Sequence, residues 1–190
     1  LEDSYMPAFL VGLGLARSLA AVNEIPLWQI SHQENHLEAG LWSAQGPDAD
    51  RFLLLHASGG TTDLLLAEKQ TDSTYALTQA GGSKDLHAGQ FVDRVGVALG
   101  LQFPAGAALE QLAATAADCI ELPVAVRQGD VSLSGPATAA LRKIEAGADP
   151  AALAAGVQYA LAETFVRMIR NVAAQKEIFD VLLVGGVVSN

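Results

Sequence analysis

Apolar and polar residues follow two different periods along the chain. Apolar positions recur every three to four residues in several stretches, which predicts helices over residues 7–22, 33–44, 86–101, 106–118, 136–147 and 150–175. Other stretches are dense in residues that favour strands, which predicts strands in IPLWQIS, RFLLLHA, TDLLLAEKQ, STYALTQAG, DVSLSG and FDVLLVGG. SGGT between the second and third of these predicts a hairpin, and the last run is typical of a central parallel strand covered on both faces.

Composition supports a globular α/β protein. Hydrophobic residues make up 51% of the 190 residues and charged residues 17%, which excludes a disordered chain. The net charge of -10 should repel phosphates, so a nucleic acid partner would need another subunit or a local basic patch. Cys119 is the one cysteine, which fits a reducing, cytoplasmic compartment, and we expect its thiol to be buried. No apolar stretch is long enough to span a bilayer.

Two histidines lie four positions apart in SHQENH. Four residues advance a helix by about 400°, so His32 and His36 share one face and can bind one metal ion, while Glu34 points elsewhere. Zinc proteases place a glutamate directly after the first histidine, but Gln33 holds that position. The spacing therefore leaves two alternatives open, a metal site without a protease base and an ordinary pair of partly buried histidines.

Glycine turns mark a second candidate site. Ser58, Gly59 and Gly60 lie between two predicted strands, and Gly185 and Gly186 follow the last strand. Glycine lets backbone N–H groups approach an anion, and ligands of open α/β sheets bind beyond the carboxyl ends of strands. The first turn is equally compatible with a plain β-turn, but the two together favour a cleft that holds the phosphates of a nucleotide.

Six segments in order resemble the family of universal tRNA threonylcarbamoyladenosine transferases, also labelled glycoproteases, peptidase family M22 or O-sialoglycoprotein endopeptidases. They are FLVGLGLARSLA, IPLWQISHQENHLEAGL, LLLHASGGTTDLLL, AGQFVDRVGVALGLQFPAGAALEQLA, SLSGPATAAL and VLLVGGVVSN. The resemblance implies the actin-like ATPase fold (ASKHA, ribonuclease H-like). Residues 1–50 would end a first lobe and residues 51–190 would form a second, and we expect a fragment that lacks the N-terminal strands and the C-terminal segment.

The resemblance also implies a reaction and a site. Family members transfer threonylcarbamoyl from threonylcarbamoyl-AMP to N6 of adenosine 37 in tRNA. His32 and His36 would bind one divalent ion, iron or zinc. The adenylate or an ATP-type nucleotide would contact His56, Ala57, Ser58, Gly59, Gly60, Asp93, Gly106, Glu110 and Asn190. Protein partners would be TsaB- and TsaE-like subunits or a second copy in a homodimer, in the cytoplasm and without membrane association.

Several positions depart from the family pattern. Thr61 replaces a histidine, Gln90 a common glutamate and Ala137 a lysine. A metal-binding aspartate of the family's C-terminal segment lies outside the chain, so we expect a two-histidine metal site, weak binding and an inactive fragment. A second hypothesis is a divergent, non-catalytic paralogue that serves as a nucleotide-binding or interaction subunit. A metallopeptidase is disfavoured, because Glu34 is misplaced for activating water.

Overall fold

The structure, a computed structural model, describes residues 7–189 and divides the chain into two compact units, residues 1–32 and 33–190. The boundary falls at the first residue of helix α2 (His32–Ala44), so His32 is described with that helix. The two lobes predicted to meet between residues 50 and 51 are a different division of the chain, and they stay a prediction.

The first unit consists of helix α1 (Pro7–Asn23) and an irregular segment that leads to α2. The helix predicted over residues 7–22 is therefore confirmed. The strand predicted in IPLWQIS is wrong, since residues 25–31 have no regular structure. A strand needs a neighbour for its N–H and C=O groups, and apolar composition alone does not supply one. Among the helices within residues 7–189, none combines the length and the apolar character needed to cross a membrane.

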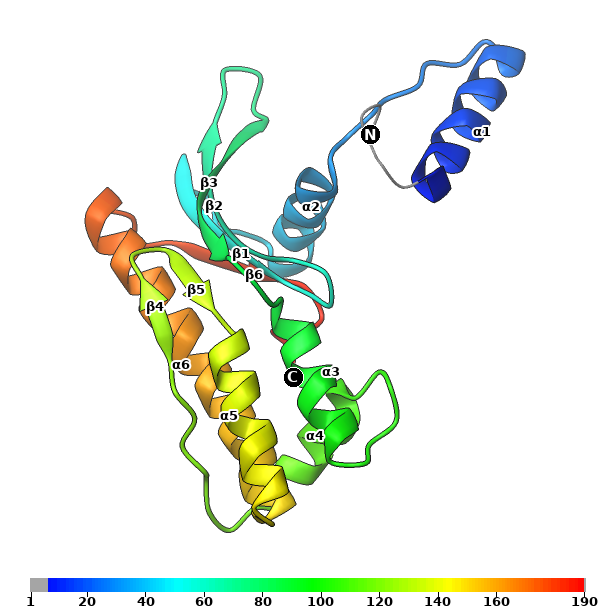
Figure 1. Cartoon of the computed structure of the whole chain (residues 1–190). Helices are drawn as coiled ribbons and strands as arrows, with labels where there is room; N and C mark the ends of the chain where they lie inside the picture. The colour runs from blue at the N-terminus through cyan, green and yellow to red at the C-terminus, as the bar shows by residue number, and fades with distance from the viewer. Residues whose placement is uncertain (1–6, 190) are drawn as a thin grey trace. The chain divides into compact units, whose positions relative to one another are not determined.

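A six-stranded sheet organises the second unit (Figure 1). Its strands are β1 (Arg51–Ala57), β2 (Thr62–Lys69), β3 (Tyr75–Ser83), β4 (Ala125–Arg127), β5 (Asp130–Ser132) and β6 (Val181–Val184). Their order is β4-β5-β3-β2-β1-β6, with β1 antiparallel to β2 and parallel to β6. The hairpin, the third strand and the parallel last strand are thus confirmed.

Two strand predictions need correction. Strand β6 lies at the edge of the sheet, and Leu183 is 51% exposed, so β6 is not a central strand covered on both faces. The segment DVSLSG is not one strand. Strand β5 ends at Ser132, and the next helix begins at Ser134. Strand β4 was not predicted, because three residues are too few to show a period.

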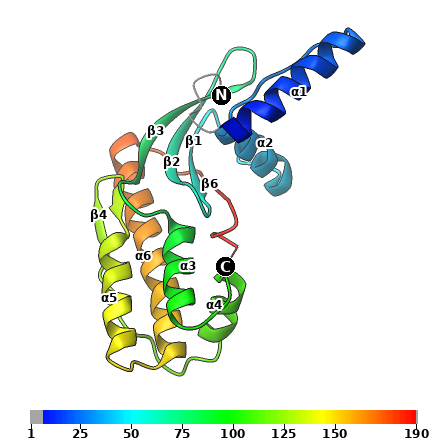
Figure 2. The same cartoon turned by 45° about the vertical axis from the view of Figure 1, so that its right-hand side comes forward.

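Four helices pack together next to the sheet, and the longest, α6, runs along one sheet face (Figures 1 and 2). They are α3 (Ala88–Ala98), α4 (Gly106–Ala113), α5 (Ser134–Glu145) and α6 (Pro150–Lys176). All four were predicted, although α4 ends earlier than expected. Asp149 caps α6 by accepting the N–H of Ala152, and Pro150 follows it at the first helical position. Cys119 lies in the loop after α4 and is exposed, so the prediction of a buried thiol is wrong.

Strand β1 is covered on both faces by helices. Leu53 and Leu55 pack with α6 residues such as Met168, whereas Phe52 and Leu54 pack with Leu37 of α2. This follows from the strand period of two, which sends successive side chains to opposite faces. The side chain of His56 continues the second series and therefore lies on the α2 face.

Helix α2 approaches the sheet closely because residue 40 has no side chain. A Cβ placed on Gly40 would lie 2.6 Å from Cγ1 of Val184 and 3.1 Å from Cδ2 of Leu182, both on β6. Since real Cβ atoms essentially never come this close, a larger residue would push α2 away from the sheet.

We expect Gly40→Ala to lower the free energy of unfolding by about 1 to 3 kcal/mol, the usual cost of overpacking. Gly135→Ala is the control, since a Cβ on Gly135 of α5 meets no atom within 4 Å and alanine favours the helix. Urea denaturation followed by circular dichroism measures both variants. Equal stability of the two would contradict the close approach of α2.

Candidate functional site

Helix α2 presents His32 and His36 on one face. His32 is its first residue and is exposed, and His36, one turn later, is half-buried. The predicted shared face is confirmed, since the ligand atoms of the two rings lie within 4.8 Å of each other. Leu37, next to His36, is 1% exposed and anchors the helix to the apolar side of the sheet.

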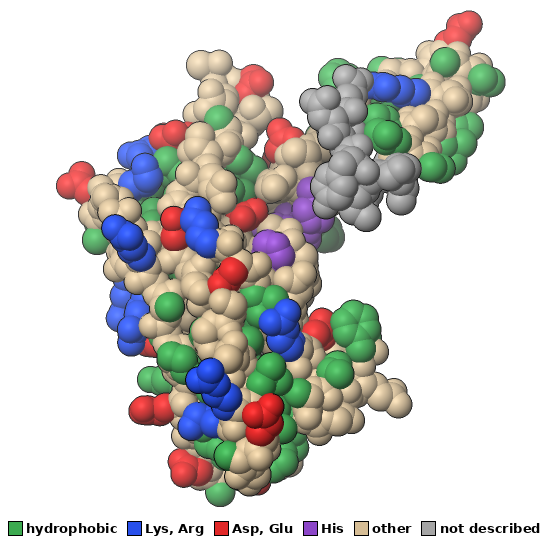
Figure 3. Space-filling model, in the orientation of Figure 1, with side chains coloured by type: hydrophobic (Ala, Val, Ile, Leu, Met, Phe, Trp, Pro, Cys, Tyr) green, Lys and Arg blue, Asp and Glu red, His purple; other side chains and the backbone are tan. Residues whose placement is uncertain are grey.

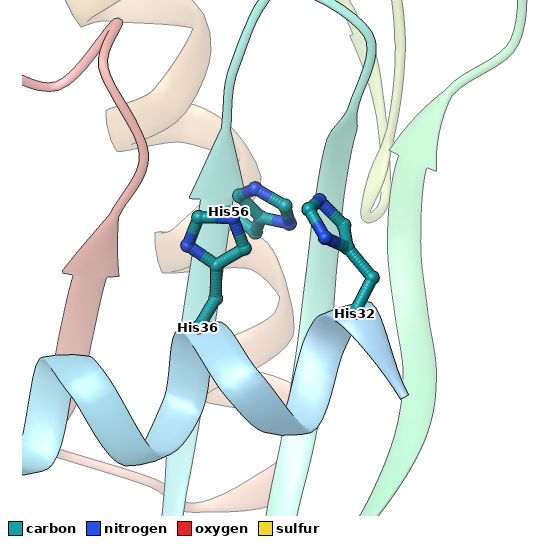
Figure 4. A group of neighbouring side chains, drawn as sticks. All are labelled: His32, His36 and His56. Carbon is teal, nitrogen blue, oxygen red and sulfur yellow. The ribbon is translucent and has the colours of Figure 1, made fainter. Parts of the chain in front are cut away.

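His56 of strand β1 completes a group of three histidines. Its ring is fully buried, and its centroid lies 4.1 Å from that of His36 at an interplanar angle of 38°. One ring nitrogen from each of the three histidines lies within 4.8 Å of the others. Figure 4 shows the two α2 rings pointing at the His56 ring from one side. We call these residues the three-histidine group.

The donor set of this group suits a divalent transition metal. Catalytic zinc sites often have three protein ligands and keep one position open for water or substrate, and imidazole also suits iron. The family resemblance implies that His56 contacts the nucleotide and that the third metal ligand lies outside the chain. The structure instead places His56 with His32 and His36, so a third imidazole is available within the chain. His56 is therefore an alternative to the third ligand expected outside the chain, and the two-histidine site stays a prediction.

The turn after β1 and the start of helix α3 pack against each other. The Ser58 N–H donates to the Thr61 carbonyl across the turn, at 2.8 Å. The N–H of Gly89 donates to the Ser58 carbonyl at 3.1 Å. A Cβ on Gly89 would lie 2.5 Å from Cα of Gly59, so only glycine permits this contact. The N–H and the carbonyl of Ser58 are therefore both already engaged within the protein.

A cavity of about 200 Å³ lies where four backbone segments of the second unit meet. Its lining comes from the hairpin turn, α3, the start of α4 and the turn after β6, through Gly59, Gly89, Val92, Asp93, Pro104, Gly106, Gly186 and Val187. Among the described residues that line the cavity, Asp93 is the one with a charge. It accepts the N–H of Ala105 at 2.7 Å, which ties α3 to the loop before α4.

The cavity gathers part of the predicted nucleotide-binding set. Gly59, Asp93 and Gly106 line it together, as does Gly186 from the second glycine turn. The remaining predicted residues are not in the lining: Ala57 is buried and accepts the Val187 N–H, Glu110 is exposed on α4, and Ser58 and Gly60 belong to the hairpin turn. Asn190 lies outside the described residues.

Asp63, on the strand next to His56, and His87, whose charge acts on Asp63, are two further titratable residues that were not predicted. Asp63 is directly opposite His56 in the β1–β2 pairing, and His87 precedes α3. Burial raises the pKa of Asp63, and the nearby charge of His87 partly offsets this rise in pKa. Figure 3 shows histidine side chains gathered on one part of the surface. The strand alternation could have placed Asp63 on the face of His56, once the register was known.

Asp85 organises the loop that precedes His87. It accepts hydrogen bonds from the hydroxyls of Ser132 and Ser134 and from the N–H groups of Leu133 and Leu86. Burial acts to raise the pKa of Asp85, but these hydrogen bonds outweigh it and hold the pKa well below its ordinary value. The carboxylate thereby joins the loop after β3 to the start of α5.

We expect Asp85→Asn to lower the free energy of unfolding by about 1 to 2 kcal/mol at pH 7, as loss of a capping carboxylate does. Because the folded-state pKa is lowered, the carboxylate stabilises the fold above the unfolded pKa of about 3.9, and this stabilisation is lost as pH falls. The difference between wild type and variant should shrink from about pH 5 to pH 2 in urea titrations. Asp118→Asn, at an exposed carboxylate that accepts the Cys119 N–H, is the control and should differ by under about 0.5 kcal/mol. A pH-independent difference for Asp85→Asn would contradict this account.

Comparisons with known proteins point to one family. The family whose sequence model matches residues 5–190 is described as tRNA N6-adenosine threonylcarbamoyltransferase. A protein of that name from Methanopyrus kandleri is 36% identical to this chain, and the alignment covers 97% of this chain and 52% of the relative. Another from Thermus thermophilus is 37% identical, and its alignment covers 96% of this chain and 55% of that relative. The chain thus spans about half the length of these curated relatives.

A solved structure shows the fold. The crystal structure of Acidaminococcus fermentans (R)-2-hydroxyglutaryl-CoA dehydratase component A aligns with a TM-score of 0.52 at 18% identity. The alignment covers 88% of this chain and 57% of that chain. At this identity the likeness concerns the fold alone. With the family match, it confirms the predicted α/β fold of the actin-like ATPase type.

Proposed function

The chain belongs to the tRNA N6-adenosine threonylcarbamoyltransferase family, and from this premise we propose that it carries a metal and nucleotide site for threonylcarbamoyl transfer to tRNA. The observation that supports this most strongly is the three-histidine group, in which three imidazole nitrogens approach within 4.8 Å. His32, His36 and His56 would hold one divalent ion, iron or zinc. When bound, that ion would polarise the carbamoyl carbonyl and offset the negative charge of the adenylate.

The proposed reaction needs no nucleophile from the protein. The N6 lone pair of adenosine 37 attacks the carbamoyl carbon of threonylcarbamoyl-AMP, and the bond from that carbon to the phosphate oxygen breaks. AMP leaves with the electron pair of that bond, and the N6 nitrogen loses one proton. The chain's own residues would hold and orient the two substrates. Holding two reactants close together in the right orientation lowers the activation barrier of the reaction.

The cavity at Asp93 suits the nucleoside part of the adenylate. Its one charged lining residue is a carboxylate, which accepts hydrogen bonds from ribose hydroxyls but repels a phosphate. Val92, Pro104 and Val187 provide apolar surface for a base. The phosphate would then lie away from Asp93, towards backbone N–H groups or a bound cation.

Whole-protein properties are also part of the proposal. We propose that the partners of the chain are TsaB- or TsaE-like subunits or a second copy of the chain, and that the protein works in the cytoplasm. The inactivity predicted for the 190-residue chain stays a prediction, although His56 could supply the third ligand that was expected outside the chain. The assay is transfer of labelled threonylcarbamoyl to tRNA by the full-length protein with its partners. Nucleotide and metal binding without transfer would favour the non-catalytic paralogue, and zinc-dependent peptide cleavage abolished by Glu34→Gln would favour a peptidase.

Metal binding can be tested on the chain itself. We expect His32→Gln, His36→Gln and His56→Gln each to weaken zinc binding by more than about 100-fold, since each removes one of three donors. Competition with a chromophoric chelator gives the affinity, and cobalt absorption reports the ligand geometry. Glu38→Gln, at an exposed residue of the same helix, is the control. Unchanged affinity in the His36 variant would contradict the site.

Nucleotide binding provides a separate test. We expect Asp93→Ala to weaken AMP binding by about 10-fold or more, the usual value of a hydrogen bond to a charged group. Asp93→Asn retains an acceptor for the Ala105 N–H and should show a smaller loss. Isothermal titration calorimetry measures both, with Asp118→Ala as the control. If AMP binds equally to all of these proteins, the cavity does not hold the ribose.

A further inference from the structure

The turn that follows strand β6 packs against the end of β1, where His56 lies. The two strands are parallel, and their register places His56 beside Val184, the last residue of β6. In Figure 4, β6 (red) and the chain that leaves it run beside this end of β1. The N–H of Val187 donates to the carbonyl of Ala57 at 3.1 Å. This hydrogen bond ties the turn to the residue that directly follows His56.

Gly185 brings this turn close to the His56 ring. A Cβ on Gly185 would overlap the carbonyl oxygen of Ala57 and lie 3.1 Å from Cδ2 of His56. A side chain at this position would therefore force the turn, the ring or both to move. The backbone φ of Gly185 is +100°, which residues other than glycine rarely adopt. Both the conformation of the turn and its distance from the ring therefore require glycine.

The contact with Gly185 lies at a part of the imidazole that affects how the ring is directed. In imidazole, Cδ2 is bonded to Nε2, one of the two nitrogens that can bind a metal. The torsion between the ring of a histidine and its Cβ has only broad intrinsic preferences, so the neighbours of the ring must set it. The His56 ring is fully buried, and its centroid lies 4.1 Å from that of His36. Because Cδ2 and Nε2 move together, the backbone at Gly185 limits the directions in which Nε2 of His56 can point.

The same turn also forms part of the wall of the cavity at Asp93. Gly186 and Val187 follow Gly185 directly, and both line that cavity. One short segment therefore lies against the His56 ring at its first residue and against the cavity at its next two. A shift of this segment would change the position of His56 relative to a nucleoside in the cavity. Functional groups of a site need to be held within about 0.5 Å of their productive geometry, so such a shift would matter.

We propose that Gly185 is a positioning residue, which orients the His56 ring for metal binding and fixes that ring relative to the nucleoside cavity. The inference rests on the metal and nucleotide sites proposed above, and it adds a residue that touches neither ligand. Gly185 acts through His56, because its lack of a side chain lets the backbone of the turn pack against the ring. Changing a group that orients a metal ligand typically lowers the metal affinity by about 10- to 100-fold.

The test compares alanine substitutions at two glycines of positive φ. We expect Gly185→Ala to weaken zinc binding by about 10- to 100-fold, measured by competition with a chromophoric chelator, and to alter the absorption of bound cobalt. Gly147→Ala is the matched control, because Gly147 lies between α5 and α6 with a φ of +76°, and a Cβ there meets no atom within 4 Å. This control should also lose thermal stability through backbone strain, yet bind zinc within about twofold of wild type. A merely structural role for Gly185 would lower the melting temperature and leave the cobalt absorption unchanged.

NMR of the wild-type chain tests the contact even where Gly185→Ala does not fold. The metal-free chain should show a nuclear Overhauser effect between Hα of Gly185 and Hδ2 of His56, and bound AMP should shift the Hδ2 signal, since the turn adjoins both. If wild type binds zinc and AMP but lacks the Overhauser effect or the shift, or if a folded Gly185→Ala keeps its zinc affinity, this inference is overturned and the proposed sites stand. If wild type binds no zinc or no AMP, the proposed function fails at that site, and this inference fails with it.

Discussion

The direct packing of helix α2 on the sheet is the constraint on which the three-histidine group depends. Gly40 lets the helix approach Leu182 and Val184 of β6, and Leu37 fills the apolar face next to them. Both contacts lie within the same two turns of helix as His36, so the distance between helix and sheet sets the distance between His36 and His56. A helix displaced by one side-chain layer could not bring the two rings to 4.1 Å.

The identity of residue 56 is better explained by function than by packing. Its neighbours on the same face, Phe52, Leu54 and Leu65, are apolar and buried, and an apolar residue would fill this position at lower cost. Burying an imidazole next to two more imidazoles instead costs folding free energy and requires a particular arrangement of the three rings. Both features are typical of ligand sites. Asp63 on the same face adds a carboxylate to a surface that is otherwise apolar further along the strands.

Local patterns in the sequence predict the elements well but predict the site only in part. The helical period placed His32 and His36 on one face, because that relation depends on five consecutive residues. His56 could be placed on the face of Leu54 by the strand period, but no local signal says which helix covers that face. The cavity at Asp93 has the same difficulty, since Gly59 and Gly186 are brought together only by the parallel pairing of β1 and β6. The prediction for Cys119 was wrong because α4 ends at Ala113, so Cys119 lies in the following loop with its side chain exposed.

The charge of the chain affects the metal ion and the tRNA of the proposed reaction differently. A net charge of -10 attracts cations towards the three imidazoles and favours a site that concentrates a divalent ion. The same field opposes tRNA, because most of the affinity for nucleic acids comes from neutralising phosphates with basic residues. Eleven basic against twenty-one acidic residues cannot supply that neutralisation over a broad surface. In the proposed reaction, tRNA affinity must therefore come from a local basic patch or from basic surface on a partner, while this chain contributes the metal and nucleoside sites.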